Sequence, residues 1–104
     1  MPKFVFAYHG GTAPRTPEEG EEVMGQWMAW YQGMGAAVLD GGGPAGPSKT
    51  VSPKGVSDDG GANPISGFTL IEAADIAAAS EMAKGCPMVV DGSGSVEIAE
   101  IMQM

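Results

Sequence analysis

Two titratable residues stand where the chain leaves a predicted strand, and together they suit acid–base catalysis. His9, the only histidine, ends an apolar run, and Asp40 ends another just before a glycine run. A carboxylate beside an imidazole fixes its tautomer and raises its basicity, as proton transfer near neutral pH requires. We therefore predict His9 and Asp40 as a catalytic pair. In the alternative, His9 is a partly exposed strand-end residue and Asp40 caps its own glycine turn.

The glycine run after Asp40 leaves space for a ligand. Its backbone amides can steady an oxyanion, so the predicted ligand contacts include Gly41, Gly42 and Gly43. Residues 41–46 have the glycine spacing of a nucleotide-binding loop, but Pro47 stands where that loop needs lysine. Proline also lacks the N–H that a phosphate cradle uses. We expect a small organic ligand here and no nucleotide or other cofactor.

Three more side chains are predicted to contact this ligand. Ser48 and Lys49 follow the glycine loop and suit an anionic group, although Lys49 is equally explained as a solvated surface cation. Trp27 lies on the apolar face of the predicted first helix, where its ring either lines a cleft or packs in the core. The sequence leaves both alternatives open for Trp27.

Metal and thiol chemistry are not expected. With one histidine and one cysteine, the chain lacks the converging nitrogen and sulfur ligands of a zinc site. Cys86 follows the end of a predicted helix, away from the positive surroundings that activate a thiol, so we interpret it as structural. A single cysteine also excludes an intramolecular disulfide framework.

The charge composition of the chain excludes two classes of binding partner. The 104 residues carry a formal net charge of -8 and only five Lys plus Arg. Binding to nucleic acid or to an anionic membrane surface needs clustered cations, so we expect neither. No apolar run approaches the roughly 20 residues of a membrane span, and no signal-peptide pattern is present. We expect a small acidic protein in the cytoplasm.

Hydrophobic periodicity and capping residues predict the elements that position these side chains. Thr16 is a plausible helix N-cap with Pro17 at the first helical position, and Asp75 can cap a second helix. The segment 48–52 is either a strand continuation or the first arm of a hairpin. One domain over residues 1–104 is expected, with strands at 3–9, 36–40, 67–73 and 95–102 and helices at 17–34 and 76–84.

The order of these elements predicts an α+β fold. Two strand–helix–strand units in one sheet form the ferredoxin-like βαββαβ arrangement. Two helices cover only one face of such a sheet, yet strands 3–9 and 67–73 carry apolar residues on both faces. A second copy of the chain is the simplest cover for the other face, so we predict a homodimer.

Several segments together resemble the YCII-related domain family. They cover nearly the whole chain and comprise Phe4–Tyr8, Val38–Pro44, Ser66–Ala73, Ala83–Pro87 and Gly94–Ile98. The resemblance implies a dimeric α/β barrel, in which two ferredoxin-like sheets face each other around a cleft. It also implies a small-molecule ligand near the dimer interface. Whether the protein is an enzyme or a non-catalytic sensor or regulatory accessory protein is left open.

The chain departs from two patterns of that family. Residues 56–61 resemble an Asp-Gly-Pro-Phe signature found in one branch, but lack its Pro-Phe. Some members are described with an aspartate at the exit of the first strand and a histidine on the first helix. Here the strand exit carries His9, and the helix has no histidine. The family's acid–base pair therefore does not transfer to this chain.

Overall fold

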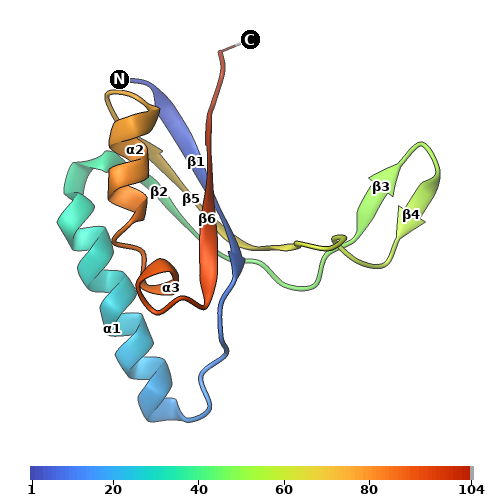
Figure 1. Cartoon of the computed structure of the whole chain (residues 1–104), viewed down its shortest axis with the longest axis horizontal. Helices are drawn as coiled ribbons and strands as arrows, with labels where there is room; N and C mark the ends of the chain where they lie inside the picture. Colours follow the sequence, from blue (N-terminus) through green and yellow to red (C-terminus); the bar gives the residue numbers. More distant parts are fainter. Residues whose placement is uncertain (104) are drawn as a thin grey trace.

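The computed structural model describes residues 1–103, which form a mixed α+β domain of antiparallel strands and helices (Figure 1). The 3-10 turn η1 (Gly35–Ala37) links the first helix to the second strand. The other elements are β1 (Lys3–Gly10), α1 (Pro17–Met34), β2 (Val38–Pro44), β3 (Thr50–Ser52), β4 (Gly55–Ser57), β5 (Ile65–Glu72), α2 (Ile76–Ala83), α3 (Pro87–Val90) and β6 (Gly94–Glu100).

Four strands form the main sheet in the order β2-β5-β1-β6, and every neighbouring pair is antiparallel. β1 and β2 therefore run parallel, as the helix crossover between them predicts, but β5 lies between them. The helices lie together on one side of this sheet (Figure 1). We call the other side the open face.

Alternation along the strands divides their residues between the two faces. Phe4, Phe6 and Tyr8 of β1 are buried beneath the helices, while the residues between them are half-buried on the open face. In β5, Thr69 and Ile71 are buried on the helix side. The predicted two-sided apolar character of β1 and β5 is confirmed, because the open face carries Val5 and Ala7 of β1 and Phe68 and Leu70 of β5. Phe68 is 40% exposed there.

Both predicted N-caps are formed. The Thr16 hydroxyl accepts a hydrogen bond from the Glu19 amide at 3.1 Å, and the Asp75 carboxylate accepts one from the Ala78 amide at 2.8 Å. These side chains satisfy amides that have no partner in the first helical turn. α1 and α2 therefore begin where the capping residues predict.

Helix α1 is held to the sheet by aromatic contacts, since none of its residues is fully buried. Trp27 meets Tyr8 edge-on at 5.1 Å between ring centroids, and Trp30 stacks on Phe6 at 6.1 Å. The Trp30 indole N–H also donates to the Met82 carbonyl at 3.0 Å, which ties α1 to α2. Such edge-to-face and offset pairs stabilise a core beyond the area they bury.

Strand β2 continues past Asp40, where the sequence predicted its end. Its pairing with β5 shifts register between Asp40 and Gly43, so the intervening residues bulge. Gly42 has φ +62°, and a Cβ atom there would lie 2.0 Å from the Phe68 carbonyl oxygen. Only glycine fits at this point, and the bulge allows the glycine run to remain in the sheet.

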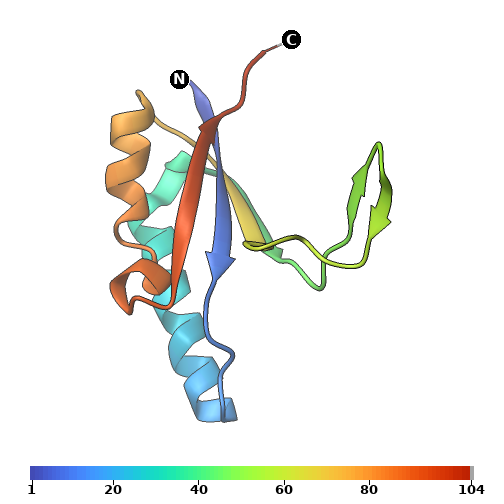
Figure 2. The same cartoon turned by 45° about the vertical axis from the view of Figure 1, so that its right-hand side comes forward.

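Strands β3 and β4 form a separate hairpin, which resolves the alternatives for residues 48–52 in favour of a hairpin arm. Figures 1 and 2 show it projecting beyond the end of the sheet, on the side away from the helices. Within residues 1–103, no helix is both long enough and apolar enough to cross a membrane.

Candidate functional site

A cavity of about 680 Å³ opens between α1, α3 and the helix-covered side of the sheet. Aromatic rings and thioethers make up much of its wall, which is typical of sites for small organic ligands. These side chains are Tyr8, Met24, Trp27, Tyr31 and Met88, while Phe68, which alternation places on the open face, borders the cavity beside Gly42 of β2. Glycines of β2 and of the segment after β1 form much of the remaining lining, so the backbone borders the space directly.

A hydroxyl network lies where α1 meets the sheet beside the cavity. The Tyr8 hydroxyl donates to the Thr69 Oγ1 atom at 2.7 Å, and Thr69 donates to the Gly41 carbonyl at 3.1 Å. The Tyr31 hydroxyl lies 3.3 Å from the Gly41 carbonyl oxygen and 3.1 Å from Thr69 Oγ1. Three strands and α1 thus meet in one network, which fixes the Tyr8 and Tyr31 rings in the cavity wall.

Burial keeps the Tyr8 hydroxyl protonated within this network. Burial raises the pKa of Tyr8 far above its ordinary value, and the hydrogen bond to Thr69 only partly opposes this shift. Tyr8 is 4% exposed and Thr69 is fully buried. The Tyr8 hydroxyl therefore stays protonated near neutral pH and donates its hydrogen bond to Thr69.

Two further polar groups lie at the cavity. The Ser66 hydroxyl is buried and has no hydrogen-bond partner within the described chain. The Asp91 carboxylate accepts a hydrogen bond from the Ser93 amide at 2.8 Å, and hydrogen bonding by the Ser93 side chain, followed by this amide, lowers the pKa of Asp91. The cavity thus combines an apolar wall, a free hydroxyl and a carboxylate that remains ionised.

The predicted ligand contacts fall into two groups. Trp27 and the three glycines Gly41, Gly42 and Gly43 line the cavity. Ser48 and Lys49 lie outside the lining, and the Lys49 ammonium pairs with the Asp58 carboxylate at 2.7 Å. The Lys49–Asp58 pair lies at the base of the β3–β4 hairpin. Neither Ser48 nor Lys49 therefore borders the cavity beside the glycine run.

His9 lies on the open face, and within the described chain every hydrogen-bond partner of its ring is an acceptor. Nδ1 lies 3.0 Å from the Asn63 carbonyl oxygen and 3.2 Å from that of Pro64, while Nε2 lies 2.9 Å from Glu97 Oε1. The Glu97 hydrogen bond is the main reason that the pKa of His9 is raised. This arrangement favours the doubly protonated imidazolium, whose two nitrogens both donate.

Asp40 is not a partner of His9. Its Oδ1 accepts a hydrogen bond from the Gly42 amide at 2.8 Å, which is the turn-capping alternative that the sequence allowed. Asp40 is level with Val5 across β5, whereas His9 lies at the far end of β1. Two strand spacings and four residues along a strand separate them by about 16 Å. The predicted pairing of His9 with Asp40 is therefore wrong in its geometry, and their individual catalytic roles stay predictions.

Sequence reasoning missed the groups that shape the cavity wall. Alternation along the strand placed Tyr8 on the same face as Phe4 and Phe6, but its hydroxyl partner Thr69 is 61 residues away. Met88 belongs to α3, a short helix after Cys86 that was not predicted. Cys86 itself is fully buried, and burial raises its pKa, in keeping with a structural role.

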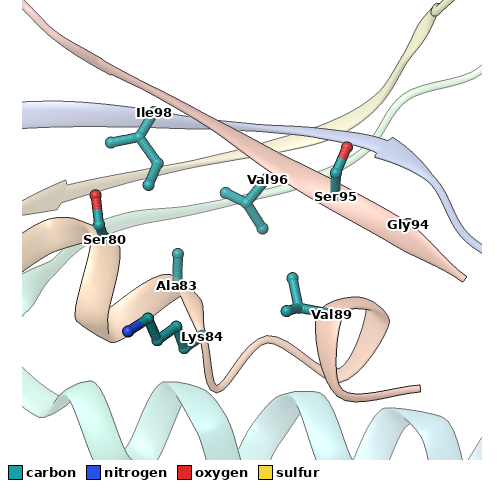
Figure 3. Close-up of a pocket in the computed structure, with 8 residues that line it drawn as sticks. All are labelled: Ser80, Ala83, Lys84, Val89, Gly94, Ser95, Val96 and Ile98. Carbon is teal, nitrogen blue, oxygen red and sulfur yellow. The ribbon is translucent and has the colours of Figure 1, made fainter. Parts of the chain in front are cut away.

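A second, shallower hollow of about 290 Å³ lies between α2, α3 and β6. Figure 3 shows Ala83, Val89 and Val96 facing it, while Ser95 points to the opposite side of β6. Its one charged side chain, Lys84, is paired with Glu81 at 2.7 Å. This hollow lacks the rings and the unpaired polar group of the larger cavity. Within residues 1–103, no cluster of three His, Cys, Asp or Glu side chains is arranged to hold a metal ion.

Comparison with known families assigns the chain. The model of the YCII-related domain matches residues 4–104, essentially the whole sequence. The chain belongs to the YCII-related domain family. The resemblance of its strand and loop segments to that family is thereby confirmed. No curated protein sequence gives a significant match.

The fold is similar to a solved enzyme structure. That structure is 5-chloro-2-hydroxyhydroquinone dehydrochlorinase (TftG) from Burkholderia phenoliruptrix, in complex with 2,5-dihydroxybenzoquinone. The TM-score is 0.59 at 13% sequence identity, and the match covers 100% of this chain and 96% of the other. At this identity the likeness establishes the shared α+β fold.

Proposed function

We propose that this YCII-related protein binds a small, planar, hydroxylated aromatic molecule in the cavity between α1 and the sheet. The observation that carries the proposal is the cavity itself: about 680 Å³, walled by rings and thioethers, with few polar groups. Flat rings stack on such walls, and hydroxyl or carbonyl substituents need only a few donors and acceptors for orientation. The ligand of the similarly folded dehydrochlorinase, 2,5-dihydroxybenzoquinone, belongs to this chemical class.

The polar groups suit such substituents. The unpartnered Ser66 hydroxyl is a donor for a quinone carbonyl or an acceptor for a phenol. The Tyr31 hydroxyl has one proton and two acceptors within reach, so a ligand oxygen competes with contacts that are already long at 3.1 and 3.3 Å. The ionised Asp91 at the cavity accepts a hydrogen bond from a ligand hydroxyl.

The proposal places this cavity in a homodimer. The strand order β2-β5-β1-β6 in a βαββαβ chain is that of a ferredoxin-like subunit, which supports the dimeric barrel. The open face carries exposed apolar side chains, among them Leu39 at 44% and Phe68 at 40%. A second open face packed against this one removes that apolar surface from water.

Binding, with or without turnover, is the core of the proposal. His9 lies on the opposite side of the sheet from the cavity lining, and its imidazolium form acts as an acid and not as a base. In the catalytic version, the molecule that is turned over lies against the open face, outside the cavity, where His9 and Asp40 act on it separately, and His9→Gln lowers the rate of its turnover. In the alternative, a non-catalytic sensor or regulatory accessory protein, ligand is bound and recovered unchanged.

Two methionines of α1 provide a matched test of the binding site. Met24 lines the cavity and is 63% exposed, whereas Met28, one turn later, does not line it and is 52% exposed. We expect Met24→Lys to weaken binding of 2,5-dihydroxybenzoquinone at least about tenfold in isothermal titration calorimetry, because it puts a charge in the apolar wall. Met28→Lys leaves the affinity unchanged. Equal affinities for the two variants contradict this location of the site.

A further inference from the structure

The segment 46–64, here called the arm, leaves the sheet after β2 and returns at β5. Every residue of its strands β3 and β4 is exposed. The Cα radius of gyration is 14.8 Å, against about 13 Å for a compact domain of this length, in keeping with a projecting segment. An isolated two-stranded hairpin buries too little to be stable in water by itself.

The arm nevertheless has a defined internal structure. Thr50, Val51 and Ser52 pair with Ser57, Val56 and Gly55, and the Thr50 hydroxyl donates to the Asp59 carbonyl at 2.7 Å. The opposed pair of Val51 and Val56 is 78% and 63% exposed. No other part of the described subunit covers this exposed apolar pair near the end of the hairpin. Such a surface is typical of a contact with another molecule.

The base of the arm is attached to the open face. His9 holds the Asn63 and Pro64 carbonyls through Nδ1 and Glu97 of β6 through Nε2. Figure 2 shows the arm standing off the sheet on the side opposite the helices. Any molecule that covers the open face therefore lies beside the arm and is able to contact both surfaces.

The size of the open face supports a second copy with its arm engaged. From strand spacing and rise, four strands of about seven residues present about 450 Å². A stable homodimer needs about 800 Å² from each copy. The sheet alone falls short by nearly half, and the arm is the remaining surface on that side.

Charge also favours another copy as the occupant. The arm carries Lys49 and Lys54, two of the five cations in a chain with a net charge of -8, together with Asp58 and Asp59, so its own net charge is zero. Lys49 is paired with Asp58, while Lys54 lies in the turn between β3 and β4. A cation at the outer end of the arm is complementary to an acidic partner such as this chain itself.

We infer that the arm clasps the second subunit of the homodimer, with Val51 and Val56 packed against the partner's surface. The contact is reciprocal about the two-fold axis, so each subunit both extends an arm and receives one. This inference rests on the proposed homodimer but not on the proposed ligand.

A charge-neutral exchange of the valine pair tests the arm. Val51→Lys with Val56→Glu removes the apolar surface but keeps an attractive cross-strand pair, so the hairpin persists. The control, Ile76→Glu with Val90→Lys, makes the same change at exposed apolar positions of α2 and α3, which are 53% and 74% exposed. By sedimentation equilibrium from about 1 to about 200 µM, we expect at least a tenfold weaker dimer for the arm variant alone.

The outcomes separate the arm from the dimer. If the arm variant and the wild type form dimers of equal affinity, the arm does not clasp the partner, although the homodimer itself remains supported. The same conclusion follows if the control variant weakens the dimer as much as the arm variant does. A wild-type monomer at the highest concentration overturns both, while ligand binding is tested independently by the methionine pair. As a second measurement, the wild-type amides of residues 50–57 should exchange more slowly with solvent at dimeric than at monomeric concentrations. Concentration-independent exchange contradicts the clasp.

Discussion

Replacing Thr69 by valine tests whether the hydroxyl network holds α1 on the sheet. Valine keeps the shape of threonine but removes Oγ1, so the Tyr8 hydroxyl loses the acceptor that lies 2.7 Å away. Tyr31 keeps the Gly41 carbonyl at 3.3 Å. One buried donor without a partner costs about 1–3 kcal/mol, and we expect a loss of about 2 kcal/mol for Thr69→Val. In a chain of this size the melting temperature falls by about 10 °C.

A double-mutant cycle with Tyr8→Phe isolates the pair. Phenylalanine removes the unpartnered hydroxyl, so adding Tyr8→Phe to Thr69→Val costs less than adding it to wild type. We expect the double variant to be about 1 kcal/mol more stable than the sum of the single losses predicts. Urea unfolding of the four proteins, followed by far-UV circular dichroism with equal m-values, gives the coupling. Strict additivity of the two losses refutes the network as a stabilising unit.

Three other changes test separate features. Gly42→Ala should lower the free energy of unfolding in urea by about 3 kcal/mol or more. Gly41→Ala, whose Cβ meets nothing within 4 Å, should lower it by about 1 kcal/mol or less, and equal losses for the two variants contradict the bulge. The stability of wild type over His9→Gln should be fully present below about pH 6.5 and fall as pH rises through the raised pKa of His9; a pH-independent difference contradicts the imidazolium. Thr16→Ala should lower the stability by about 1 kcal/mol, and no loss contradicts the N-cap.

Local chemistry made much of the fold predictable. Thr16 and Asp75 mark their helix starts because a capping side chain acts within three residues of its own position. Because side chains alternate along any strand, the sequence placed Phe4, Phe6 and Tyr8 on one face of β1, but it did not show which of the two apolar faces the helices cover. Capping and alternation depend only on residues that are close in sequence, so they could be predicted without knowing the tertiary structure.

The end of β2 and the separation of His9 from Asp40 depend on strand pairing between segments that are distant in sequence. The strand that contains Asp40 runs on to Pro44 because β5 pairs with it, although glycine and proline disfavour strands. β5 also lies between β1 and β2, which separates His9 from Asp40. The residues near His9 and Asp40 do not reveal that insertion, although it follows from the predicted ferredoxin-like arrangement. The same limit applies to the cavity, whose wall joins β1, α1, β5 and α3 through contacts distant in sequence.

The two tryptophans give the most direct measurement of ligand binding in the cavity. Trp27 lines it, whereas the Trp30 indole N–H is engaged with the Met82 carbonyl at 3.0 Å. In a ¹H–¹⁵N spectrum titrated with 2,5-dihydroxybenzoquinone, the account predicts a saturable shift of the Trp27 indole signal that exceeds the shift of Trp30. Two unmoved indole signals at saturating ligand, or a larger shift for Trp30, contradict it.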